Sequence, residues 1–205
     1  KLIHDSKIVE AISNLKLFQV NSSNQNDLLL EKLYIANIKN RLNEIQNPSE
    51  SDKARWPWEL IQNAKDSLYS PSNLTGQKRV TIFIDFNNQN NELVFSHNGP
   101  PFTENSYFGL LYKISQEKEN SQTVGRFGTG FVSTHVLSKI VEINGNKIDK
   151  NGQKVGFSVT IHREGLNDSS ISHDFKEMQK SLQIQQNLMP YTTFKYKINS
   201  DKSKE

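Results

Sequence analysis

The stretch WPWELIQNAKDSL, residues 56–68, decides the fold and anchors the functional interpretation. At about 100° per residue of an α-helix, its apolar residues fall on one side and its polar residues gather in one narrow sector. Pro57 fits the first helical turn, where its missing N–H would be unpaired anyway. The polar sector consists of Glu59, Gln62, Asn63 and Asp66.

This sector combines two carboxylates with two amides, and Glu59 and Asn63 lie one turn apart. Carboxylate and amide oxygens are ligands for Mg²⁺. A free carboxylate beside the ion can act as a base toward a water molecule. A solvated helix face would show the same pattern, so the helix alone does not decide between the two interpretations.

The length of 205 residues is enough for one substantial domain with its own core, or at most two small ones. Hydrophobic residues make up 34% and no apolar run approaches the roughly 18 residues of a membrane span, so no membrane segment or signal peptide is expected. The absence of cysteine excludes disulfides, thiolate metal sites and cysteine nucleophiles, and it fits a cytoplasmic protein. The net charge is only +3 with scattered Lys and Arg, so nucleic-acid binding is not indicated.

Hydrophobic periodicity predicts helices before residue 70 and a mixture of strands and helices after Pro71. The two helices at the start are expected to cover the core, with a dimer strap as the alternative. Strands in sequential hairpins beside grouped helices predict an α+β fold: a largely antiparallel sheet with helices on one face. The expected helices are 5–20, 27–45, 56–68, 104–116, 131–138 and 173–187, and the expected strands are 80–86, 92–96, 139–143, 154–162 and 192–198, with turns at 87–91 and 144–145.

A second motif is the glycine-rich run at 125–130, which opens a helix. Glycines let the backbone approach an anion closely, and the helix start offers free N–H groups, so the run suits a phosphate group. Its G-x-x-G-x-G spacing matches neither the dinucleotide fingerprint nor a P-loop. A simple helix cap is the alternative. The residues are Gly125, Arg126, Phe127, Gly128, Thr129 and Gly130.

A third motif, His97-Asn98-Gly99, ends a predicted strand about midway between the other two. A sharp turn after a strand can present a polar side chain and bare backbone to a flat base, although in isolation it is only a turn.

The order of these motifs resembles the GHKL superfamily, the Bergerat-fold ATPases of DNA gyrase, the ninety-kilodalton heat-shock chaperone, histidine kinases and MutL. Residues 59–66 resemble the N box, His97-Asn98-Gly99 stands where the adenine-contacting Asp-x-Gly box belongs, and 125–130 resemble the second glycine box. The match is closest to the sacsin-like, chaperone-type bacterial branch. The resemblance implies a two-layer Bergerat-type sandwich over 52–198, with 1–51 as a helical extension packed on it and 199–205 as a polar tail of what we expect to be a longer protein.

The resemblance also implies roles for individual residues. Glu59 would be the general base, Asn63 the Mg²⁺ ligand, and Asp66 a support of the nucleotide pocket. Residues 115–128 would form a lid over the phosphates. The implied nucleotide-binding residues are Asn63, Asp66, His97, Asn98, Gly99, Gly125, Arg126, Phe127, Gly128, Thr129, Gly130, Phe131 and Thr192.

One position departs from the superfamily pattern. His97 replaces the aspartate that accepts a hydrogen bond from the adenine amino group. A neutral imidazole accepts through one nitrogen only, or Asn98 turns inward and supplies an amide oxygen instead. Preference for adenine over another purine therefore stays open.

The predicted function is Mg²⁺-dependent ATP binding and hydrolysis, with lid closure driving rearrangement or nucleotide-dependent dimerisation of a larger, chaperone-like or antiphage-defence protein. The glutamate at position 59 favours hydrolysis over phosphotransfer to a histidine. The alternatives are a nucleotide-sensing module that does not hydrolyse and a structural or nucleic-acid-binding domain with a degenerate pocket.

Overall fold

The computed structural model describes residues 24–46, 49, 51, 54–112 and 131–198. Six strands in this part of the chain form one sheet in the order β1-β2-β6-β3-β4-β5, and every strand pair is antiparallel. The predicted α+β class with a largely antiparallel sheet is confirmed. The strands are β1 (Ile82–Asn87), β2 (Glu92–His97), β3 (Ile140–Ile148), β4 (Lys154–His162), β5 (Gln183–Gln185) and β6 (Thr192–Lys197).

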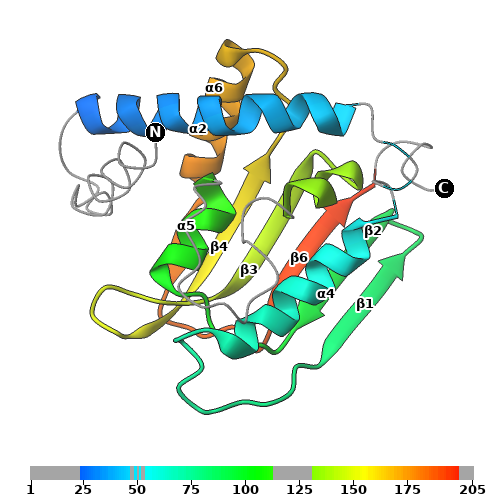
Figure 1. The fold of residues 1–205 in the computed structure, drawn as a ribbon, viewed down its shortest axis with the longest axis vertical. Helices are drawn as coiled ribbons and strands as arrows, with labels where there is room; N and C mark the ends of the chain where they lie inside the picture. Colours follow the sequence, from blue (N-terminus) through cyan, green and yellow to red (C-terminus); the bar gives the residue numbers. More distant parts are fainter. Residues whose placement is uncertain (1–23, 47–48, 50, 52–53, 113–130, 199–205) are drawn as a thin grey trace.

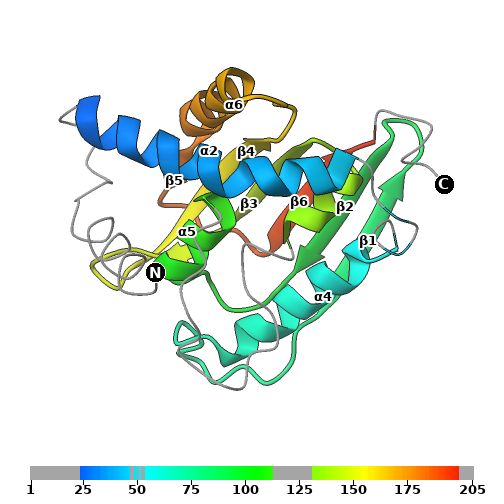
Figure 2. The ribbon, with the colours of Figure 1, turned by 45° about the horizontal axis from the view of Figure 1, so that its top comes forward.

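The helices cover one face of this sheet and leave the other open (Figures 1 and 2). Four central strands bury alternate residues against the helices, as the two-residue period of a strand requires. On the open face, Lys195 bridges Glu92 and Glu142 across three strands, at 3.0 and 3.6 Å. The helices are α2 (Asn24–Gln46), α4 (Trp56–Asp66), η1 (Ser67–Tyr69), α5 (Glu104–Tyr112), η2 (Phe131–Val136) and α6 (Asp168–Ser181).

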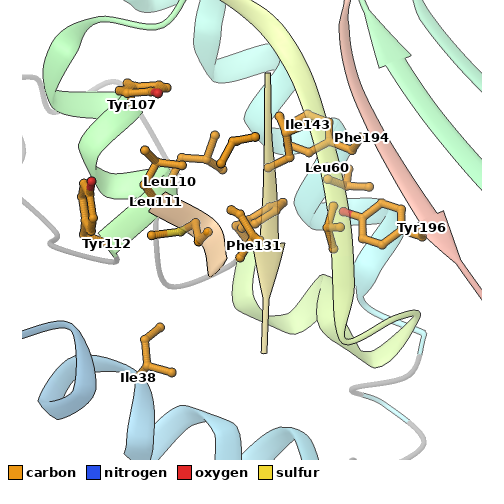
Figure 3. Packing of buried hydrophobic residues seen from close by; sticks show 14 of the residues in the cluster. Ile38, Leu60, Tyr107, Leu110, Leu111, Tyr112, Phe131, Ile143, Phe194 and Tyr196 are labelled. Carbon is orange, nitrogen blue, oxygen red and sulfur yellow. The ribbon is translucent and has the colours of Figure 1, made fainter. Parts of the chain in front are cut away.

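The core lies between this helical layer and the sheet. Figure 3 shows Leu60 of α4 beside Tyr196 and Phe194 of β6, with Phe131 of η2 close by. Aromatic rings interlock there, since the Phe131 and Phe194 centroids lie 5.5 Å apart. Burial of this apolar surface is the main force that holds the two layers together.

Helix α2 belongs to the same core. Its residues Leu30, Tyr34, Ile38 and Leu42 are buried in the main hydrophobic cluster. The Tyr34 ring packs on Phe175 of α6 at 4.9 Å, and Lys39 forms an ion pair with Asp168. The interpretation of the second predicted helix as core cover is therefore correct for this helix, whereas the first predicted helix, 5–20, lies outside the described residues.

The predicted turn at 144–145 is wrong, because β3 continues to Ile148. Asn146 is held in the strand region by its amide, which donates to the Met189 carbonyl at 2.7 Å and accepts from the Met189 N–H at 2.9 Å. The chain turns instead at 149–152, where Asp149 Oδ1 accepts from two backbone N–H groups and Gly152 adopts a φ of 77°.

The last predicted helix also starts earlier than expected. Asn167 and Ser170 form a reciprocal capping box, which begins α6 at Asp168 rather than at 173. The helix ends at Ser181, and 183–185 form the short strand β5.

Strand β1 forms one edge of the sheet and is mostly exposed. Ile84 and Phe86 share the face of Phe95 and Leu93 through the pairing of β1 with β2, yet Ile84 is 50% exposed. In the part of the chain that the structure describes, the helical layer does not reach this edge.

Candidate functional site

The polar sector of α4 is turned into the protein. Asn63 is 5% exposed and Asp66 is 6% exposed, whereas Trp58 is 70% exposed. Helix α4 lies on the covered side of the sheet, with its Leu60 beside Phe194 and Tyr196 of β6 (Figure 3). The alternative of a solvated helix face therefore does not hold for these two side chains.

Asn63 carries an unmet hydrogen-bonding group. Its Nδ2 is buried and has no partner within the described part of the chain. A buried polar group without a hydrogen-bond partner lowers the stability of the folded protein. Such groups are expected at functional sites, so this one indicates a role for Asn63. The amide also offers an oxygen of the kind that Mg²⁺ accepts alongside water and phosphate.

Asp66 is held in place on the same helix face. Its Oδ1 accepts a hydrogen bond from Gln62 Nε2 at 2.7 Å. Gln62 therefore positions the Asp66 carboxylate. The sequence pattern did not indicate this role of Gln62.

Glu59 is mostly buried but not free. Its Oε1 accepts from Arg55 Nε at 2.8 Å, one helical turn earlier, with side-chain exposures of 16% and 62% for Glu59 and Arg55. The pair lies at the first turn of α4, where a carboxylate is also favoured by the helix dipole.

At the end of β2, His97 is buried at 4% exposure. Its Nδ1 accepts a hydrogen bond from the Gly99 backbone N–H at 3.1 Å. The ring stacks on Phe194 with an interplanar angle of 22° and a centroid distance of 6.3 Å. Burial lowers the pKa of His97 to about 4, so the imidazole is neutral at physiological pH.

Thr192 lies directly across from His97. The two residues are register partners between β2 and β6, and Thr192 is 4% exposed. The structure therefore brings together two predicted site residues that are 95 positions apart in the sequence.

Asn98 does not turn inward as one alternative required. The residue is exposed, and its Oδ1 accepts from the Thr81 backbone N–H at 2.8 Å. Its carbonyl oxygen also accepts from Gln77 at 3.0 Å. Asn98 therefore ties the turn to the segment before β1 and supplies no acceptor to the interior.

Gly99 is a glycine for steric reasons. A Cβ at this position would lie 2.3 Å from Ser67 Oγ and 2.8 Å from His97 Nδ1. The turn after β2 is thus pressed against Ser67, directly after α4, and the two motifs meet there. Ser67 was missed by the sequence interpretation because a serine at a helix end gives no distinctive signal.

The predicted lid and phosphate loop, 115–128 and 125–130, lie outside the described residues, so their placement stays a prediction. Phe131, the first residue after them, is 1% exposed and packs in the core, with its ring against Phe194 and His135. It is thus a core residue in this structure, where the resemblance implied a contact with nucleotide.

A buried polar chain that the sequence did not indicate fastens η2 to the sheet. Tyr196 Oη donates to Thr134 Oγ1 at 3.0 Å, and Thr134 Oγ1 donates to the Phe131 carbonyl at 2.7 Å. His135 beside them is fully buried, and burial lowers its pKa to about 3.

A metal held by protein side chains alone finds no support in the described ranges, where no cluster of three or more His, Cys, Asp or Glu occurs. The single amide oxygen of Asn63 instead fits an ion whose other ligands are phosphate oxygens and water. This is the usual coordination of Mg²⁺ in nucleotide sites. Among the helices described, none is both long and apolar enough to cross a membrane.

Comparison with known proteins gives one distant similarity. The chain is 25% identical to the chaperone protein HtpG of Vibrio vulnificus (strain YJ016) over 161 residues, which cover 68% of this chain. The chain spans about a quarter of the length of that relative, since the match covers 25% of it. No family model matches the chain.

Proposed function

We propose that this chain is a GHKL-type nucleotide-binding domain that binds ATP with Mg²⁺ and hydrolyses it. The observation that best supports this proposal is that the polar sector of α4 faces the interior of the protein. Asn63 and Asp66 are buried there, and Asn63 Nδ2 lacks a partner among the described residues. A helix that served only to cover the core would place such groups in water.

In this proposal each described residue has a distinct task. The Asn63 side-chain oxygen would hold Mg²⁺, and Asp66 would support the pocket from the same face. When bound, the ion neutralises charge on the phosphates and orients them. Glu59 takes a proton from the attacking water, and His97 with Thr192 borders the base at the ends of β2 and β6.

The proposal extends to the undescribed run at 125–130, which would hold the phosphates, and to 115–128 as the lid. Closure of such a lid would change the shape of a larger protein or its association as a dimer. The similarity to a chaperone supports a chaperone-like role over the other roles that this kind of domain serves.

The second candidate, a nucleotide sensor without turnover, is favoured by one observation. Glu59 Oε1 is already engaged by Arg55 at 2.8 Å, which leaves Oε2 as the oxygen that can take a proton from water. If the pair persists with nucleotide bound and holds Oε2 away from the attacking water, the domain binds but does not hydrolyse.

One experiment separates the two candidates: phosphate release from Mg²⁺-ATP is measured for the purified chain and for its Glu59→Ala variant. Hydrolysis predicts turnover that the variant loses while its melting temperature still rises with nucleotide. A sensor predicts the same rise for both proteins and no turnover in either. If no nucleotide raises the melting temperature, the proposal is wrong.

A further inference from the structure

The two buried histidines of the described chain lie in opposite hydrogen-bonding environments. His97 Nδ1 faces an N–H group, that of Gly99, at 3.1 Å. His135 Nδ1 faces a carbonyl oxygen, that of Ser138, at 3.2 Å. A neutral imidazole carries one proton, and the partner of one nitrogen decides where that proton resides.

For His97 the consequence is a proton on Nε2. Nδ1 must present its lone pair to Gly99, and burial keeps the ring neutral at physiological pH. A flip of the ring about its Cβ–Cγ bond would put Cδ2 in the place of Nδ1 and lose the hydrogen bond from Gly99, so the ring, stacked on Phe194, keeps Nδ1 toward that N–H group. His97 therefore presents a donor, Nε2–H, on its remaining edge.

Within the described part of the chain, no group accepts a hydrogen bond from this Nε2–H. Asn98 supplies no acceptor to a ligand either, because its Oδ1 accepts from the Thr81 N–H group on the surface. The end of β2 thus offers a donor at the position where the resemblance implied an acceptor.

We infer that His97 makes the base subsite selective for a purine with an oxygen at position 6, guanine or hypoxanthine, over adenine. This inference rests on the proposed function. The 6-oxo group accepts a hydrogen bond from Nε2–H, whereas the 6-amino group of adenine donates and would meet another donor. Adenine could meet Nε2–H only through a ring nitrogen such as N1 or N7, and its amino group would then lack an acceptor from His97.

A matched nucleotide panel tests this selectivity on the unaltered chain. ITP and ATP differ at the 6-position and the N1 proton that accompanies it, GTP adds a 2-amino group, and inorganic tripolyphosphate has no base. With Mg²⁺ present, competition binding is expected to give dissociation constants for ITP and GTP about tenfold below that for ATP, since one mismatched polar pair is worth about this factor. Tripolyphosphate should bind more weakly than all three.

Two further measurements bear on the mechanism. ¹⁵N NMR of the imidazoles should show His97 protonated on Nε2 and His135 on Nδ1, so each ring is a reference for the other. His97→Asp should reverse the order and favour ATP, whereas the same change at exposed His173 should leave the order unchanged. If His97→Asp does not fold, the panel and the NMR assignment on the unaltered chain still decide.

The outcomes separate this inference from the proposed function. ATP binding as tightly as ITP or more tightly, no gain from any base over tripolyphosphate, or a proton on His97 Nδ1 overturns the selectivity and leaves nucleotide binding standing. If neither nucleotide nor tripolyphosphate binds, the proposed function fails and the selectivity fails with it.

Discussion

Arg55 caps the start of α4 and Glu59 lies one helical turn later, and Arg55 Nε donates to Glu59 Oε1 at 2.8 Å. The arginine is 62% exposed and the glutamate only 16%, so the pair links a solvated cation to a sheltered carboxylate. An ion pair with one exposed partner contributes little to stability. Its main consequence is therefore to hold the carboxylate in one position.

Replacing Glu59 by glutamine should remove the base and keep the shape of the side chain. Phosphate release should fall by about 10²–10⁴-fold, the usual contribution of a positioned base. The rise in melting temperature with Mg²⁺ and nucleotide should persist. Turnover equal to that of the unaltered chain would remove Glu59 from the mechanism.

Replacing Arg55 by alanine should release the Glu59 carboxylate. We expect faster phosphate release, because both carboxylate oxygens are then open to the attacking water. Stability should change by only ~0.5 kcal/mol in urea unfolding, as for other exposed pairs. A slower reaction would instead mean that Arg55 itself assists turnover.

Replacing Asn63 by alanine should separate stability from binding. The variant removes a buried amide nitrogen that lacks a partner in the described chain, which offsets the small void left behind. Unfolding free energy without ligand should therefore stay within ~1 kcal/mol of that of the unaltered chain or exceed it, whereas the Mg²⁺-dependent rise in melting temperature should disappear. Lys65→Ala, an exposed position on the same helix, is the control and should change neither quantity. Normal Mg²⁺-dependent stabilisation of the Asn63 variant would contradict its assignment.

The fold was predictable where periodicity is strong. Residues 154–162 and 192–198 alternate as strands, and both form strands near these limits. The turn at 144–145 was mispredicted because Asn-Gly is a local signal, and the contacts of Asn146 with Met189 are 43 residues apart in sequence. Local propensity cannot include such a contact.

The candidate site divides in the same way. Helical spacing correctly grouped Asn63 with Asp66, because spacing along one helix is a local property. The Ser67 contact with Gly99 and the Thr192 register with His97 depend on how distant segments pack, which no spacing rule provides. The protonated nitrogen of His97 follows only from its hydrogen-bond partner.

Replacing Gly99 by alanine should be destabilising and coupled to Ser67. The new methyl group would lie 2.3 Å from Ser67 Oγ, and overpacking of this kind costs about 1–3 kcal/mol. In the double variant with Ser67→Ala the nearest obstructing atom is gone, so the combined loss should be smaller than the sum of the single losses. Gly76→Ala, which meets no atom within 4 Å, should show no such coupling to Ser67. If the losses of the two single variants simply add in the double variant, the turn accommodates the new methyl group by moving atoms other than Ser67 Oγ.

The two buried histidines should make stability fall in acid. Burial lowers the pKa of His97 from 6.5 to about 4 and that of His135 from 6.5 to about 3. Below about pH 6.5 the unfolded chain binds protons that the folded chain refuses, so protonation favours unfolding. The stability that each neutral histidine contributes is therefore fully present above pH 6.5. It is lost as the pH falls toward 4 for His97 and toward 3 for His135. Each histidine contributes a slope of up to about 1.4 kcal/mol per pH unit in that window.

Urea unfolding at pH 7 and pH 5 measures the loss, and His135→Phe, which keeps a ring against Phe131, should remove about half of the histidine-dependent part. His173→Asn replaces a histidine whose side chain is 73% exposed and should leave the pH dependence nearly unchanged. An identical slope in the His135 variant would show that this histidine is protonated in the folded protein as readily as in the unfolded chain.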